Sequence, residues 1–107
     1  MVSTIERMEE LTQVFARLAD ELSGAETTYK IEFARQRYTL RTTTNDEGKK
    51  YTVDVAEDMA TEATKEYLIA YEGTKAKYDA CRQALSTVRA QLEGYRSLMA
   101  SHREAGG

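Results

Sequence analysis

The sequence contains no proline and no tryptophan, and only one of its 107 residues is cysteine. Without proline, no pyrrolidine ring forces a helix to end, so long helices are permitted. A single cysteine excludes an intramolecular disulfide and is typical of a reducing compartment. A chain of this length with 41% hydrophobic residues cannot enclose a large globular core, so its helices must pack on one another or on a partner.

The chain also lacks the patterns of a targeted or membrane-spanning protein. It begins Met-Val-Ser-Thr-Ile-Glu, without the basic start and apolar run of a signal peptide, and no stretch is long and apolar enough to cross a bilayer. We therefore expect a soluble, cytoplasmic protein.

Catalytic and metal-binding motifs are missing as well. There is no glycine-rich phosphate loop, no Cys/His metal spacing and no calcium-loop pattern. Cys81 and His102 are too far apart along one predicted helix to act together as a nucleophile and base within the chain. We expect no enzyme activity, no cofactor and no metal.

Two helices are predicted before the first loop. Ser3 and Glu6 have the spacing of a capping box, and an apolar stripe with steps of three and four residues follows it. Ser23-Gly24 interrupts this segment and repeats the capping spacing with Glu26, so we expect a break or hinge between a helix over 4–22 and a second over 24–40.

A polar loop is expected over 41–52, where three consecutive threonines and an Asn-Asp-Glu-Gly run disfavour helix. Thr52 or Asp54 can then cap a long helix over 54–103 that meets no strong stop signal. At 1.5 Å per residue this helix would be about 75 Å long, which a globular domain of this size could not bury.

The long helix carries a heptad seam, because apolar and aromatic side chains recur with alternating steps of three and four residues. Its members, apart from Thr74 and His102, are Tyr71, Tyr78, Cys81, Leu85, Val88, Leu92, Tyr95 and Met99. We therefore predict an all-α protein with one domain over 1–107. Its architecture is an elongated helical hairpin or coiled coil with a long C-terminal helix, and it is oligomeric.

Charge is distributed in blocks, acidic over 1–27 and 51–73 and basic over 28–50 and 74–107. Within the last block, five cations spaced seven residues apart flank the seam: Lys75, Arg82, Arg89, Arg96 and Arg103. They can pair with acids of a neighbouring helix, for which Glu6, Glu9, Glu10, Asp20 and Glu21 are available. Alternatively, part of this stripe can contact a phosphate backbone.

The other basic segment, over 29–41, interleaves aromatic and cationic residues. Tyr29, Phe33 and Tyr38 alternate with cations there, and two lysines follow in the loop. Such a segment can stack bases and hold the phosphates of a single strand, although the aromatics can equally be core residues. The predicted nucleic-acid-binding residues are Lys30, Arg35, Arg37, Arg41, Lys49 and Lys50.

The chain as a whole resembles the UvsY-like recombination mediators, a family of short phage-encoded helical proteins. The likeness covers most of the chain and rests on Tyr29-Lys30 and Phe33-Ala34-Arg35, on Ala60-Thr61-Glu62-Ala63 and Glu66-Tyr67-Leu68, and on the C-terminal segment 90–103. The resemblance implies a ring-like homo-oligomer that binds single-stranded DNA around Arg35. It also implies help in loading a recombinase onto DNA coated by a single-strand-binding protein, in the host cytoplasm.

A second hypothesis belongs to a different class. The charge blocks can select protein partners, which would make the chain a protein-only coiled-coil adaptor, a scaffold or an inhibitor of a host defence protein.

Overall fold

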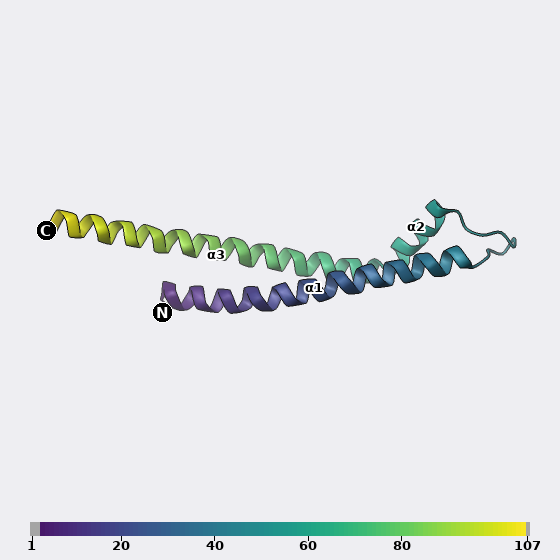
Figure 1. Cartoon of the computed structure of the whole chain (residues 1–107), viewed down its shortest axis with the longest axis horizontal. Coiled ribbons are helices and arrows are strands. Elements are labelled where there is room, and N and C mark those ends of the chain that lie inside the picture. Colours follow the sequence, from purple (N-terminus) through teal and green to yellow (C-terminus); the bar gives the residue numbers. More distant parts are fainter. Residues whose placement is uncertain (1–2, 107) are drawn as a thin grey trace. The chain divides into compact units, whose positions relative to one another are not determined.

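The computed structural model describes residues 3–106 and contains three helices (Figure 1). They are α1 (Thr4–Thr42), α2 (Val53–Ala63) and α3 (Lys65–Gly106). The predicted all-α class is confirmed, and so is the packing of a long C-terminal helix on the first helix. Among the described residues, no helix combines the length and apolar character needed to cross a membrane.

The helices contribute to two compact units. The loop unit is Asp20–Lys75 and holds the second half of α1, α2 and the start of α3. The terminal unit consists of the residues up to Ala19 and from Ala76 onward.

In the terminal unit α1 and α3 pack side by side in opposite directions. The thiol of Cys81 contacts the carbonyl oxygen of Leu11 at 3.5 Å, and the ring of Phe15 lies on that of Tyr78. As residue numbers rise along α1 they fall along α3, so the two segments are antiparallel, as in the predicted hairpin. The buried side chains of this unit are Leu18, Cys81, Leu85 and Val88.

The core of the loop unit is built from small side chains on α2. Ala56 and Ala60 are fully buried and Thr64, which ends α2, is 1% exposed. These three residues recur every four positions, so they form one narrow stripe along which a neighbouring backbone can approach closely. Tyr29 of α1 and Tyr71 of α3 stack in the same unit, with ring centroids 6.1 Å apart.

The expected break at Ser23-Gly24 is wrong, because α1 continues through both residues. Leu22, Ala25 and Tyr29 keep the three-and-four spacing across the glycine and are all half-buried. Packing along this stripe outweighs the cost of about 1 kcal/mol that one glycine adds to a helix.

The expectation of one unbroken helix over 54–103 is also wrong, because it is divided at Thr64. Thr64 caps the end of α2: its amide donates to the carbonyl oxygen of Ala60 at 3.0 Å and its hydroxyl donates to the same oxygen at 2.7 Å. Figure 1 shows α2 leaving the axis of α3 at this point. The predicted seam over Tyr71 to Met99 nevertheless lies within the single helix α3.

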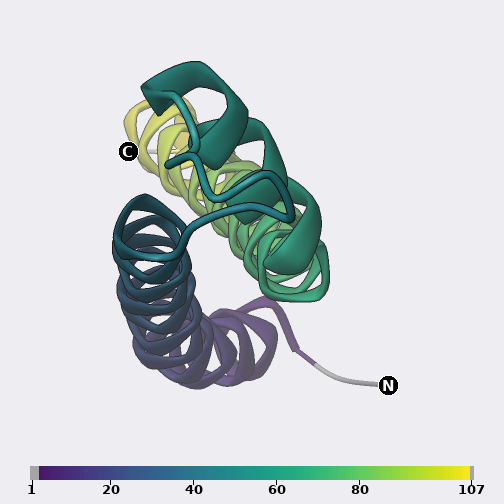
Figure 2. The ribbon, with the colours of Figure 1, turned by 90° about the vertical axis from the view of Figure 1, so that its right-hand side faces the viewer.

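Two capping predictions agree with the structure. The Ser3 hydroxyl accepts a hydrogen bond from the Glu6 amide at 3.1 Å, and the Thr52 hydroxyl accepts one from the Val55 amide at 3.3 Å. Both side chains satisfy amides that have no partner in the first turn of a helix. The intervening connection is shorter than predicted, since α1 extends to Thr42 and α2 begins at Val53 (Figure 2).

Candidate nucleic-acid interface

All six cations predicted to bind nucleic acid lie in the loop unit, and all six side chains are exposed. Four are carried by the second half of α1, and Lys49 and Lys50 belong to the connection between α1 and α2. No group of three or more metal-binding side chains occurs within residues 3–106.

The helix divides its four cations between two sides. Lys30, Arg37 and Arg41 are separated by seven and four residues, so they project from the same face of α1. Arg35 and Arg37 are two residues apart and project from nearly opposite sides, because positions i and i+2 do not face each other. A single strand in contact with Arg37 and Arg41 would thus leave Arg35 on another face.

The three aromatic residues of this segment also separate. Tyr29 and Phe33 are half-buried and lie 6.1 Å from each other between ring centroids, on the side that packs in the unit. Tyr38 is 72% exposed and points away from that side. Tyr29 and Phe33 are thus core residues, and Tyr38 alone presents a free ring on which a base could stack.

Three of the cations have carboxylates beside them. The Lys30 ammonium donates to Glu26 at 2.6 Å, and the Arg35 guanidinium donates to Glu32 at 2.9 Å. Hydrogen bonding to Glu26 raises the pKa of Lys30 above its ordinary value, so this ammonium is charged at neutral pH. These exposed pairs are weak, but a phosphate has to compete with each carboxylate.

The Arg37 guanidinium lies near two groups, a carboxylate and an aromatic ring. Its guanidinium lies 3.9 Å from the Glu57 carboxylate of α2 and 5.9 Å from the centre of the Phe33 ring. The cation–π contact and the ion pair both fix the side chain along the surface of the unit. Sequence spacing could not predict the Glu57 contact, because it depends on where α2 packs.

The remaining three cations, Arg41, Lys49 and Lys50, have no carboxylate partner among the described residues. The turn that carries the lysines is ordered by Asn45, whose side-chain oxygen accepts hydrogen bonds from the amides of Glu47 and Lys49. Gly48 adopts a positive φ of 77°, and a single antiparallel bridge joins Thr44 to Lys50. Lys49 and Lys50 therefore extend from a turn whose backbone conformation is fixed by hydrogen bonds.

The predicted seam is covered along only part of its length. Cys81, Leu85 and Val88 are buried, and Tyr71, Tyr78 and Leu92 are half-buried. In contrast, Tyr95 is 59% exposed and Met99 is 58% exposed. Within residues 3–106, the last turns of α3 thus lack a covering helix.

Among the described residues, the basic stripe beside this seam pairs only within α3. Arg82 lies 3.6 Å from Asp79, and Arg96 donates to Glu93 at 3.0 Å. No ion pair joins the described stripe residues to Glu6, Glu9 or Glu10 of α1. Glu6, Glu9 and Glu10 are instead exposed in the first turns of α1.

No protein-family model, curated protein or solved structure matches the chain.

Proposed function

We propose that this protein binds single-stranded DNA through the loop unit and acts, as an oligomer, as a recombination mediator that assists recombinase loading. The observation that carries the proposal is the free ring of Tyr38, 72% exposed, three residues from the unpartnered guanidinium of Arg41. An exposed aromatic ring beside cations is how proteins without sequence preference hold single strands. The mediator role itself rests on the resemblance to UvsY-like proteins.

In this proposal the residues have different roles. Tyr38 stacks on a base, and Arg41, Lys49 and Lys50 contact successive phosphates because no carboxylate within residues 3–106 pairs with them. Arg37 and Lys30 lie on the same face as Arg41 and contribute more weakly through their ion pairs. Since one unit offers few contacts, an oligomer multiplies them into useful avidity.

The test is fluorescence anisotropy of a labelled oligothymidine at about 50 mM and about 200 mM salt, between which counterion release strongly weakens phosphate binding. We expect Tyr38→Ala to weaken binding by about fivefold or more, in line with the stacking energy of one base. Arg41→Ala combined with Lys49→Ala should flatten the salt dependence by about two phosphate contacts.

Two comparisons sharpen this test. Arg35→Ala combined with Arg37→Ala should weaken binding less than the Arg41/Lys49 pair, because both arginines already have carboxylate neighbours. Lys65→Ala combined with Lys77→Ala removes the same charge elsewhere and should leave affinity within about twofold. Equal effects of all three pairs would show that only net charge matters, and unchanged binding by Tyr38→Ala would remove the proposed stacking site.

The alternative function is a protein-only coiled-coil adaptor, scaffold or inhibitor, and the ion pairs of Lys30, Arg35 and Arg37 favour it. These carboxylates reduce the positive potential of the face that a polyanion would meet. The adaptor hypothesis predicts no oligothymidine binding even at about 50 mM salt, where electrostatic contacts are strongest.

A further inference from the structure

The ion pair between Arg37 and Glu57 differs from the others at the proposed DNA site. Lys30 and Arg35 pair with carboxylates of α1 itself, four and three residues away. Arg37 instead lies 3.9 Å from a carboxylate of α2, beyond the connection between the two helices. This contact therefore exists only while α2 packs in the loop unit.

Burial of α2 determines where the Glu57 carboxylate lies. Ala56, its neighbour in the chain, is fully buried, and so is Ala60 one turn further on. These two residues define the face of α2 that packs in the unit, and Glu57 lies beside that face with 47% of its side chain exposed. The backbone below this carboxylate is thus held in place, while the side chain itself is free to turn into water.

Arg37 lies in the middle of the cations on its face of α1. Lys30 precedes it on this face, and Arg41 follows it one helical turn, about 6 Å, further along. Tyr38, the ring proposed to stack on a base, is the next residue in the chain. A strand that contacts both Tyr38 and Arg41 therefore passes beside the Arg37 guanidinium. The Glu57 carboxylate already occupies one side of that guanidinium.

We infer that Glu57 competes with DNA phosphate for Arg37, so that the packing of α2 lowers the affinity of the site for a single strand. The inference rests on the proposed function and assigns a regulating residue to the same site. A phosphate that binds the Arg37 guanidinium leaves the Glu57 carboxylate uncovered beside the strand. This exchange neutralises no net charge, and the uncovered carboxylate repels the neighbouring phosphates.

Removal of this carboxylate should have two effects on binding. Glu57→Gln should tighten oligothymidine binding about three- to fivefold at about 50 mM salt, the upper part of the range for one exposed ion pair. Arg37 then neutralises one phosphate without uncovering a carboxylate. The slope of log affinity against log salt should therefore steepen by about 0.7, the value for one contact to a single strand.

The test is anisotropy of labelled oligothymidine with the full chain carrying Glu57→Gln, at several salt concentrations between about 50 mM and about 200 mM. Glu62→Gln is the matched control, because it removes the same charge from an exposed position of α2 that has no ion pair among the described residues. It should change affinity by less than about 1.5-fold and leave the salt slope unaltered. Glu57→Ala, which preserves helix propensity, should give the same gain as Glu57→Gln.

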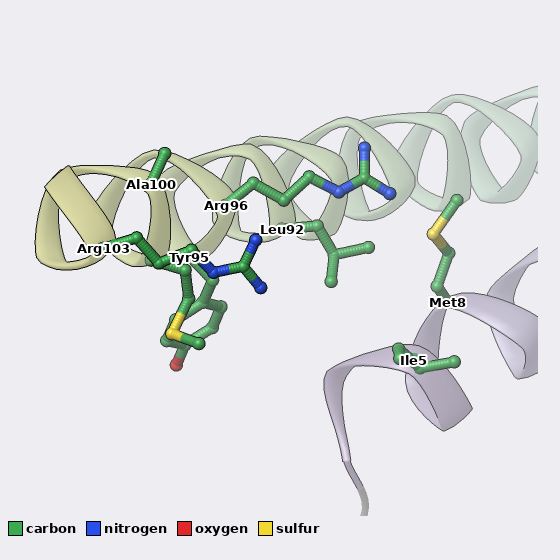
Figure 3. A pocket seen from close by; sticks show the side chains of 8 residues that line it. Ile5, Met8, Leu92, Tyr95, Arg96, Ala100 and Arg103 are labelled. Atoms are coloured by element: carbon green, nitrogen blue, oxygen red, sulfur yellow. The ribbon is translucent and has the colours of Figure 1, made fainter. Parts of the chain in front are cut away.

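A double-mutant cycle determines whether the gain depends on Arg37. In the Arg37→Ala background, Glu57→Gln should leave affinity within about 1.5-fold, because no guanidinium remains to be released. Arg103→Ala provides the comparison, since Arg103 lies beside an apolar groove between α1 and α3 in the terminal unit (Figure 3). In that background Glu57→Gln should keep its full gain, because the removed arginine is outside the loop unit.

A gain in Glu57→Gln no larger than in Glu62→Gln would overturn the inference, and so would a gain that persists without Arg37. Either result leaves the proposed function in place, because the unmodified chain still binds oligothymidine. If neither the unmodified chain nor Glu57→Gln binds it at about 50 mM salt, the proposed function and the inference both fail. Binding by Glu57→Gln alone would support the inference in its strongest form.

Discussion

The ring of Phe15 on α1 stacks on the ring of Tyr78 on α3, with centroids 4.7 Å apart and planes inclined by 28°. Both residues belong to the terminal unit, and both are half-buried. They join segments 63 positions apart in the sequence, just beside the contact between Cys81 and the Leu11 carbonyl. This stack is therefore a direct packing contact between the two helices of the unit.

Replacing either ring should destabilise the protein. We expect Tyr78→Ala to lower the free energy of unfolding by about 2 kcal/mol, less than for a fully buried aromatic because part of the ring is exposed. In a double-mutant cycle with Phe15→Ala, the coupling should be about 1 kcal/mol. Urea unfolding followed by circular dichroism at one protein concentration measures it, with the exposed Tyr38→Ala as control. Strictly additive losses would contradict a direct stack.

Ala60 should not tolerate a larger side chain. It is fully buried on the stripe by which α2 packs in the loop unit, so Ala60→Leu forces α2 outward and should cost about 2–3 kcal/mol. Ala63 is exposed on the same helix, and Ala63→Leu should change stability by less than about 0.5 kcal/mol. Thermal unfolding of the two variants gives the comparison, and similar losses from both would show that α2 does not pack through this stripe.

Two glycines should respond to alanine in opposite ways. Gly48 has a φ of 77°, which alanine adopts poorly, so Gly48→Ala should lower the free energy of unfolding by about 1 kcal/mol. Gly24 lies inside α1 with nothing within 4 Å of an added methyl group, so Gly24→Ala should raise it by about 0.5–1 kcal/mol. The same denaturation experiment measures both, and a loss of stability in Gly24→Ala would reveal an unrecognised need for glycine there.

Periodicity predicted the helices well because their stability comes from one apolar stripe. Leu85 and Val88 were predicted to lie on the seam and are among the most buried side chains. The same reasoning failed at Ser23-Gly24, where the low helix propensity of these residues was given more weight than the apolar stripe. α1 continues through both residues. Periodicity also missed the division at Thr64, because a threonine between Ala63 and Lys65 looks like an ordinary helical position.

The candidate site could be predicted only in part. The sequence named the cations and aromatics, but it did not separate Tyr38 from Tyr29 and Phe33. The sequence could in principle have shown that Tyr38 differs from the other two aromatics. Tyr29, Phe33 and Leu40 share the spacing of the apolar stripe, and Tyr38 lies two residues away from it. The ion pair between Arg37 and Glu57 could not be predicted from the sequence, because it follows from the packing of α2 in the loop unit.

Because Cys81 is buried, the reactivity of its thiol reports local opening of the terminal unit. Cys81 is 7% exposed and is the only cysteine in the chain, so an alkylating reagent reaches its thiol mainly when α1 and α3 separate around Leu11. The rate of modification under native conditions therefore counts transient openings of the terminal unit, without any introduced label. Ligands or partners that hold this unit closed slow the reaction, and those that act elsewhere leave it unchanged.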